Sequence, residues 1–282
     1  MLENTKITGF ADEIANDIES QVSLLKKLGV NYIEFRSANS KGVSSYTNGE
    51  AAELMKYLTA NGIEISALGS PIGKIMITDD FTSHFETFKH TVELTKIFGT
   101  KYIRMFSFYI PEGEKPEKYR DEVFRRMRMM VDYAKENDVI LLHENEKGIY
   151  GDNAARCREL FDEFCCSNFK CTFDFANFVQ VGQDTLEAYE LLKDFIEYVH
   201  IKDARFSDSV VVPAGQGDGN VEAILSMLDE KGYSGFLSLE PHLADFATFR
   251  TLEHTDASLK DKGGVWAFST AHEALMKLLS SK

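Results

Sequence analysis

The 282-residue chain has little cysteine and no long apolar run. Its four cysteines show neither the paired C-x-x-C spacing of a zinc site nor the spacing of a disulfide framework, so we expect reduced thiols. No stretch approaches about 18 consecutive apolar residues, and the first residues lack the apolar core of a signal peptide. These absences predict a cytoplasmic protein with no membrane contact.

Basic residues are also in deficit. Lys and Arg number 31 against 45 Asp and Glu, which gives a formal net charge of −14. Because clustered Lys and Arg bind phosphate backbones, we expect no nucleic-acid partner. The chain does contain 21 Phe and 11 Tyr, and 44% of its residues are hydrophobic. Such a composition predicts a folded globular protein with a large core.

Short strand-like runs alternate with helical patterns along the whole chain. The expected strands are Lys6–Phe10, Tyr32–Arg36, Glu64–Leu68, Tyr102–Phe106, Val139–Glu144, Cys171–Asp174, Tyr198–Lys202 and Phe236–Glu240. The expected helices are Asp17–Leu28, Glu50–Ala60, His84–Phe98, Tyr119–Asn137, Ala154–Phe164, Thr185–Leu192, Val221–Lys231 and Trp266–Leu279. This alternation predicts parallel strands with helices packed outside them.

Eight strand–helix units in 282 residues fit an α/β fold of the closed (β/α)8 kind, a TIM barrel. A doubly wound open sheet is the alternative. That fold would place a G-x-G-x-x-G segment after the first strand, and the sequence has none there. Since no linker or low-complexity segment divides the chain, we expect one domain over residues 1–282.

Side-chain alternation along the last four strands selects four polar residues. For example, Val199 and Ile201 should face the helices, which turns His200 into the barrel. The four residues lie at the C-terminal ends of their strands, and these ends meet at the C-terminal face of the barrel, where barrel enzymes have their active sites. A divalent cation suits this set, Mn²⁺ first and Zn²⁺, Co²⁺ or Mg²⁺ as alternatives, although each carboxylate could instead cap a helix or pair with an arginine. The four expected metal ligands are Glu144, Asp174, His200 and Glu240.

Four short motifs surround these residues and match the E-N-x, D-x-x-H, H-x-K-D and E-P patterns of one family. They are His143–Glu146, Phe173–Asn177, His200–Asp203 and Leu239–His242. On these motifs the chain resembles the xylose isomerase-like TIM-barrel superfamily, in its sugar phosphate isomerase/epimerase group. The resemblance covers nearly all of the chain and implies that residues 1–282 form a single domain of that type.

The resemblance also implies roles for individual residues. Glu144, Asp174, His200 and Glu240 take the places of the family's metal ligands, and Glu144 and Glu240 take those of its catalytic acid/base pair. Asn177 stands where many members have histidine, at a position that touches substrate. The implied activity is isomerisation or epimerisation of a ketose sugar or sugar phosphate.

Such a reaction needs a metal because the proton beside a carbonyl is too weakly acidic to leave at neutral pH unaided. A divalent ion would stabilise the ene-diolate while one carboxylate removes the proton and the other returns it. A lyase of the same fold, similar to inosose dehydratase, is one alternative. A DNA-repair endonuclease is a remote one, because it would need a basic groove and more histidines. A non-catalytic binding barrel would need a decayed ligand set.

Further inward positions carry charge. Glu34 and Arg36 share the inner phase of the second strand, and Arg104 has it on the fourth; these three either form a salt bridge or contact substrate. Lys202 and Arg205 follow His200 and are expected to contact a carboxylate or phosphate of the substrate.

The glycine-rich segment Gly215–Asn220 leads into a helix near the usual phosphate site of barrel enzymes. Asp218 would repel an anion there, so we expect a turn with Asn220 as the helix N-cap. Phosphorylation of the substrate and homo-oligomerisation stay open.

Overall fold

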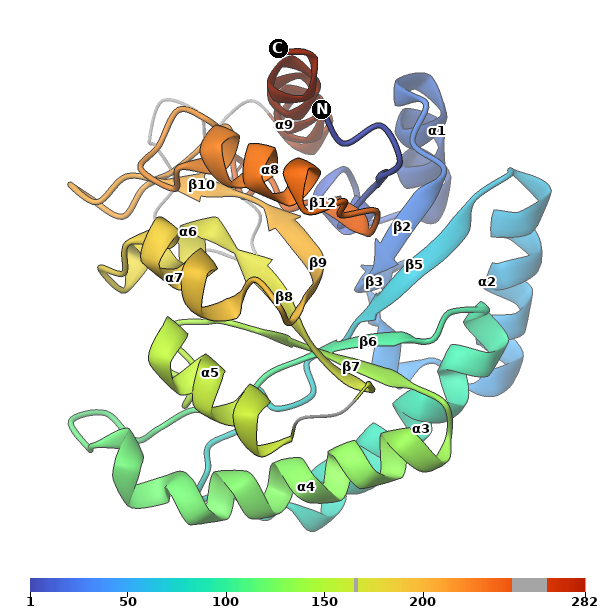
Figure 1. Cartoon of the computed structure of the whole chain (residues 1–282). Helices are drawn as coiled ribbons and strands as arrows, with labels where there is room; N and C mark the ends of the chain where they lie inside the picture. Colours follow the sequence, from blue (N-terminus) through green and yellow to red (C-terminus); the bar gives the residue numbers. More distant parts are fainter. Residues whose placement is uncertain (165–166, 245–262, 282) are drawn as a thin grey trace.

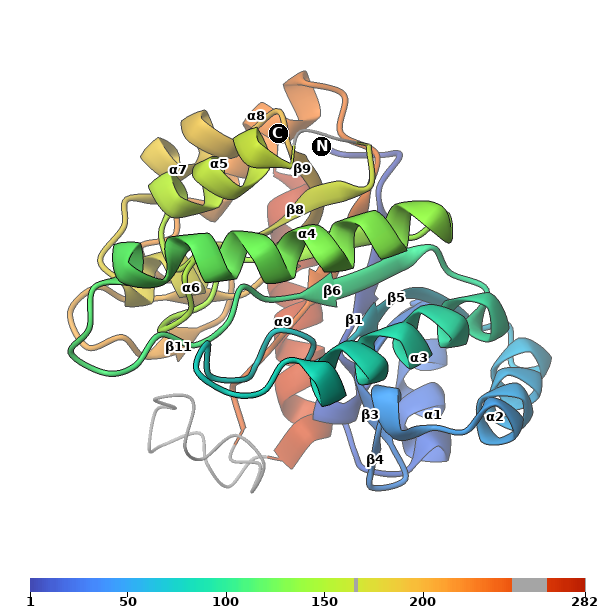
Figure 2. The same cartoon turned by 90° about the horizontal axis from the view of Figure 1, so that it is seen from below.

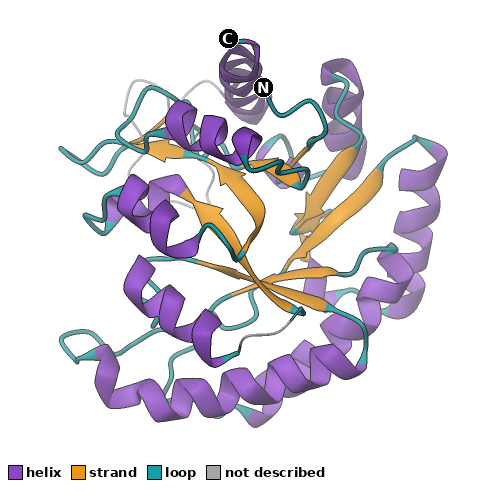
Figure 3. Cartoon of the chain, viewed as in Figure 1, coloured by secondary structure: helices purple, strands orange, loops and turns teal. Residues whose placement is uncertain are grey.

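A computed structural model describes residues 1–164, 167–244 and 263–281, and places eight parallel strands in a central ring (Figures 1 and 3). The hydrogen-bonded order is β1-β12-β9-β8-β7-β6-β5-β2, and β1 and β2 lie in contact, so the barrel is nearly closed. These strands are β1 (Lys6–Gly9), β2 (Tyr32–Phe35), β5 (Glu64–Gly69), β6 (Tyr102–Met105), β7 (Ile140–Glu144), β8 (Phe169–Asp174), β9 (Ile196–Ile201) and β12 (Phe236–Leu239).

Helices cover the outside of this ring, and Figures 1 and 2 show α3 and α4 adjacent on its surface. The predicted barrel is confirmed, and so is each of its eight strand–helix pairs. The helices are α1 (Ile18–Leu28), α2 (Asn48–Ala60), α3 (Thr82–Phe98), α4 (Arg120–Glu136), α5 (Ala154–Glu163), α6 (Phe175–Gln180), α7 (Thr185–Leu192), α8 (Val221–Glu230) and α9 (Gly263–Ser280).

Local sequence explains where the helices begin and end. Asp17 caps α1 by accepting a hydrogen bond from the Ser20 backbone, and Gly29 ends that helix with φ of 71°, a left-handed conformation that glycine adopts without strain. Helix α2 starts with a capping box between Thr47 and Glu50. The N-caps thus mark where α1 and α2 begin, and Gly29 lies in the turn that carries the chain from α1 to β2.

Several short elements were not predicted. Helix α6 follows β8 directly, and 3-10 turns lie at Ala11–Glu13, Val43–Ser45 and Pro116–Tyr119. Two hairpins also extend the loops: β3 (Ser37–Ala38) pairs with β4 (Lys41–Gly42), and β10 (Asp203–Ala204) pairs with β11 (Val211–Val212). The hairpins are too short to leave a clear alternation in sequence.

The barrel interior changes from hydroxyl-bearing to charged along its axis. Low in the barrel, the Ser66 hydroxyl lies 2.8 Å from those of both Thr8 and Tyr198. Toward the carboxyl ends of the strands, Glu34 and His200 are fully buried inside it. Burial of ionisable groups requires partners, so this end of the barrel is where the chemistry is expected.

The structure also bears on the predictions about cysteines and membrane-spanning segments. Cys157 and Cys171 are buried free thiols, as expected, whereas Cys165 and Cys166 lie outside the described residues. Within the described ranges, no helix is both long and apolar enough to cross a membrane. That residues 1–282 form one domain stays a prediction.

Candidate metal centre

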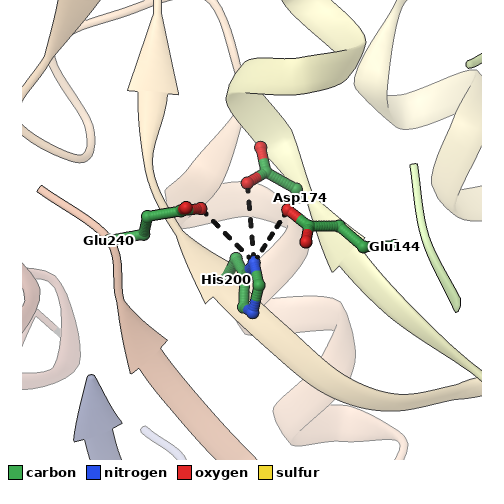
Figure 4. A group of neighbouring side chains, drawn as sticks. All are labelled: Glu144, Asp174, His200 and Glu240. Atoms are coloured by element: carbon green, nitrogen blue, oxygen red, sulfur yellow. Dashed lines mark hydrogen bonds and ion pairs between the residues drawn. The ribbon is translucent and has the colours of Figure 1, made fainter. Parts of the chain in front are cut away.

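Four side chains from successive strands converge at the carboxyl end of the barrel. Each offers one ligand atom, and these atoms lie within 4.8 Å of one another (Figure 4). Parallel pairing explains the convergence, because Asp174 on β8 lies in register with His200 on β9. All four side chains are buried. The predicted ligands that meet here are Glu144, Asp174, His200 and Glu240.

The Nδ1 atom of His200 faces all three carboxylates. It lies 3.1 Å from Glu144 Oε1, 3.4 Å from Glu240 Oε2 and 3.8 Å from Asp174 Oδ2. An imidazole lone pair would be repelled by this set, so a proton or a cation must stand between them. Burial opposes a charged imidazole, but Glu34 and Glu144 outweigh it and hold the pKa of His200 well above its usual value.

The surroundings of Asp174 also supply too little positive charge to keep its carboxyl group ionised. Burial raises the pKa of Asp174 to about 8, even though the neighbouring Lys202 ammonium acts to lower it. A buried carboxyl group that keeps its proton near neutral pH marks a place where a divalent cation could replace that proton.

The residues fit a metal ion. Among the described residues, Glu144 Oε2 and Asp174 Oδ2 are buried oxygens that accept no hydrogen bond, although cations lie 3.2 Å away at Arg104 and Lys202. Three carboxylates and one imidazole are donors that Mn²⁺, Zn²⁺, Co²⁺ and Mg²⁺ accept to different degrees. The donor set does not distinguish among these ions.

Glu144 is held by groups on two sides. Asn177 Nδ2 donates to its Oε1 at 3.2 Å, and Arg104 Nη1 lies 3.2 Å from its Oε2. Burial alone would raise the pKa of Glu144, but His200 and Arg104 lower it to about 2. Glu144 is therefore ionised at neutral pH and can accept a proton.

Glu240 has its own set of cations. Lys202 Nζ donates to Oε2 at 3.1 Å, while His242 Nε2 and Arg36 Nη1 lie 3.3 and 3.5 Å from Oε1. Against the effect of burial, Lys202 and His242 hold the pKa of Glu240 well below its usual value. Its two oxygens thus face different partners, with Oε2 toward the other ligands.

Sequence reasoning missed Glu13 as a member of the site. Its Oε1 lies 3.3 Å from His242 Nε2, and its Oε2 accepts the His242 backbone N–H at 2.7 Å. Although burial opposes it, Glu13 and then Glu240 raise the pKa of His242 to about 10. Glu13 lies four residues beyond the end of β1, in the 3-10 turn Ala11–Glu13, and so does not share the strand-end position of the predicted ligands. The signal that could have found it is the adjacent acidic pair Asp12 and Glu13 after the first strand.

Glu13, Glu240 and His242 also lie close enough to suggest a second metal group. However, Arg36 Nη2 is 3.1 Å from Glu13 Oε1 and its Nη1 is 3.5 Å from Glu240 Oε1. The guanidinium already supplies positive charge to both oxygens that would hold an ion. We therefore interpret this group as an ion-pair network that supports Glu240.

A cavity of about 850 Å³ opens onto two of the four converging side chains, Glu144 and Glu240, and its lining also includes Arg36 and Arg104. The predicted salt bridge is partly present, since Arg104 Nε lies 3.9 Å from Glu34 Oε1. Arg36 and Arg104 both line the cavity, and their contact with a substrate stays a prediction.

The other predicted substrate residues lie elsewhere. Glu34, Asn177 and Lys202 are buried below the described lining of the cavity. Arg205 lies on the hairpin loop after β10, where it pairs with Asp208 at 2.7 Å, and it is outside that lining. Contacts of these four residues with a substrate stay predictions.

The glycine-rich segment after β9 binds a carboxylate of the chain itself. Backbone N–H groups of Gly215, Gly217 and Gly219 each donate to Asp203 at 2.9 Å. A turn was predicted, and Asn220 does occupy the N-cap position of α8, but its side chain makes no capping hydrogen bond. The loop therefore offers these donors to Asp203 rather than to a phosphate.

Comparison with known proteins agrees with this geometry. The chain matches the family model described as xylose isomerase-like TIM barrel over residues 22–260. It is 24% identical over 134 residues to a 3-dehydroshikimate dehydratase of Bacillus anthracis, which is 48% of either protein. The chain thus matches about half the length of that curated relative.

Solved structures show the same fold. The crystal structure of the IOLI protein with a bound zinc atom superposes with a TM-score of 0.75 at 18% identity, over 98% of both chains. A D-tagatose 3-epimerase-like protein superposes with a TM-score of 0.73 at 17% identity, also over 98% of both.

Proposed function

The chain belongs to the xylose isomerase-like TIM barrel family, and on this premise we propose that it is a divalent-metal-dependent isomerase or epimerase of a ketose sugar or sugar phosphate. The observation that carries the proposal is the set of four buried ligand atoms within 4.8 Å of one another. We propose one ion per chain, held by Glu144, Asp174, His200 and Glu240, and a cytoplasmic location.

A bound divalent ion would act as a Lewis acid that stabilises negative charge on a substrate oxygen. Glu144 and Glu240 lie on opposite sides of His200 (Figure 4), and both have lowered pKa values. One of them, as a carboxylate, would remove the proton beside the carbonyl. The other is also ionised at rest, so it would first take up a proton from solvent and then return it to the resulting ene-diolate. Return to the opposite face of the same carbon gives the epimer, and return to the adjacent carbon gives the isomer.

The substrate occupies the cavity above these carboxylates. At about 850 Å³, the cavity lies within the range of roughly 300–1,000 Å³ that is usual for small-molecule sites. Arg36 and Arg104 line it and contact oxygens of the substrate. Asn177 and Lys202 reach the substrate from below, once it sits over the ligands.

Dehydration is the second candidate. The curated relative, a 3-dehydroshikimate dehydratase, supports it over about half of the chain. An inosose dehydratase-like activity belongs to the same class. The endonuclease alternative gains nothing, because the net charge of −14 opposes binding of a phosphate backbone.

The two reaction classes differ in what they leave in the substrate. The protein is incubated in D₂O with ketoses, ketose phosphates, keto-inositols and 3-dehydroshikimate, and each compound is followed by NMR and mass spectrometry. An isomerase or epimerase exchanges one carbon-bound hydrogen for deuterium without loss of water, and chelation stops the exchange. Faster loss of water from one of these compounds would contradict the proposal and favour the dehydratase.

A further inference from the structure

His200 has a second ring nitrogen, and it faces a carboxylate that the proposed reaction does not use. Nε2 lies 3.1 Å from Glu34 Oε2 and 3.3 Å from Glu34 Oε1. Glu34 lies on β2 and His200 on β9, and neither side chain is exposed. We propose that Glu34 is a positioning residue that orients His200 for metal binding, an inference that rests on the proposed metal-dependent function.

Glu34 is itself held in place. The Ser238 hydroxyl donates to Glu34 Oε2 at 2.6 Å, and Arg104 Nε lies 3.9 Å from Oε1. Ser238 is the residue of β12 in register with His200, so strand pairing places the hydroxyl beside the imidazole and its carboxylate. A buried carboxylate with these partners has a fixed position relative to the ring.

This position selects one tautomer of His200. A neutral imidazole has one N–H donor and one acceptor nitrogen, and an ionised carboxylate can only accept. Glu34 therefore requires the hydrogen on Nε2, which leaves the lone pair on Nδ1. Nδ1 is the nitrogen that faces Glu144, Asp174 and Glu240, so the chosen tautomer aims its lone pair at the place of the ion.

Glu34 lies under the imidazole and outside the described lining of the cavity. Both of its oxygens face His200 Nε2, so the proposal replaces the predicted substrate contact of Glu34 with an effect that is exerted through His200. The contact from a carboxylate behind a histidine ligand fixes the ring and strengthens its bond to the metal, and loss of such a partner typically weakens metal binding about 10–100-fold.

The test compares Glu34→Gln with the matched control Glu197→Gln. Glu197 lies on β9 with His200 but at its other end, where it accepts a hydrogen bond from Tyr102. Both substitutions remove one carboxylate charge and keep the side-chain size. Zn²⁺ affinity is measured by competition with a chromophoric chelator. We expect a loss of about 10–100-fold in Glu34→Gln and no change in Glu197→Gln.

Ser238→Ala provides a second variant, because it keeps the Glu34 carboxylate and removes only the hydroxyl that fixes it. Ser238→Ala should also lower the affinity for Zn²⁺, by a smaller factor than Glu34→Gln. This variant keeps the proposal testable even if Glu34→Gln does not fold. In the Zn²⁺-loaded protein labelled with ¹⁵N-histidine, the proton on His200 Nε2 should resonate far downfield and move upfield in both variants.

Wild-type affinity in both variants, or a Zn²⁺ ion bound through Nε2 of His200, would overturn the positioning role. A wild-type protein that binds no Zn²⁺ would overturn this role together with the proposed metal dependence. If the wild type binds Zn²⁺ but exchanges no substrate hydrogen, the proposed reaction fails, while the comparison of variants still decides the role of Glu34.

Discussion

Asn145 and Asp174 exchange two hydrogen bonds between the ends of β7 and β8. The Asp174 backbone N–H donates to Asn145 Oδ1, and Asn145 Nδ2 donates to the Asp174 carbonyl, both at 3.0 Å. Asp174 Oδ1 in turn accepts the Asn177 N–H at 2.8 Å as the cap of α6. The backbone and one carboxylate oxygen of Asp174 are thus fixed, and Oδ2 is directed toward His200 and Lys202.

Asn145→Ala should therefore affect both stability and metal binding. The substitution leaves two buried backbone groups of Asp174 without their partner, at a cost of about 1–3 kcal/mol for each. Chemical denaturation should show a lower free energy of unfolding, and chelator competition should show weaker metal binding. A variant with wild-type values in both measurements would contradict this role for Asn145.

Asp174→Asn separates the ligand role of Asp174 from its capping role. The amide oxygen can still accept the Asn177 N–H, but the anionic ligand oxygen is lost. Metal affinity should fall at least about tenfold, while the metal-free protein should unfold at a similar temperature. Isothermal titration calorimetry and thermal unfolding measure the two effects. A large loss of stability in the metal-free protein would mean that the carboxylate is mainly structural.

Glu144→Gln and Glu240→Gln separate metal binding from proton transfer. Glutamine keeps an oxygen ligand but cannot accept the substrate proton. Turnover should fall by about 10²-fold or more, well beyond any loss of metal occupancy under saturating metal. Steady-state assays combined with elemental analysis of each variant give both numbers. Equal losses of turnover and occupancy would reduce both residues to ligands.

Metal affinity should rise with pH. Without metal, burial raises the pKa of Asp174 to about 8, and Glu34 and Glu144 raise that of His200 well above normal against burial. Both groups therefore hold a proton at pH 7, and both protons must leave when the ion binds. Isothermal titration calorimetry of the metal into the protein, repeated in buffers of different ionisation enthalpy, should show the release of about two protons near neutral pH. Binding at equal strength at acidic and at mildly alkaline pH, without proton release, would contradict this.

The fold could be predicted because strands alternate with helices along the chain and side chains alternate between the two faces of each strand. Strands with apolar residues on the helix-facing side define the inner phase, so the positions of Asp174, His200 and Glu240 follow from their apolar neighbours. Helix boundaries follow from glycines and caps such as Gly29 and Asp17. Both kinds of signal are local, which is why the barrel and the convergence of these inward side chains at its carboxyl end could be predicted.

Side-chain contacts between strands that are far apart in the sequence leave no local signal, so they could not be predicted. Glu34 and His200 are 166 residues apart, and the inner phase of Glu34 does not distinguish a substrate contact from a contact with an imidazole. Glu13 and His242 are 229 residues apart, and they meet because they follow β1 and β12, which pair in the barrel. Arg205 follows a strand, but an unpredicted hairpin carries its side chain toward Asp208.

The most direct test of the metal centre is a crystal structure of the protein grown with Mn²⁺ and soaked with a ketose, with data collected at the metal absorption edge. We expect one anomalous peak between Glu144, Asp174, His200 and Glu240, about 2.0–2.3 Å from each ligand atom, with the sugar in the cavity above it. No peak at these four residues, or a single peak between Glu13 and His242 instead, would contradict it.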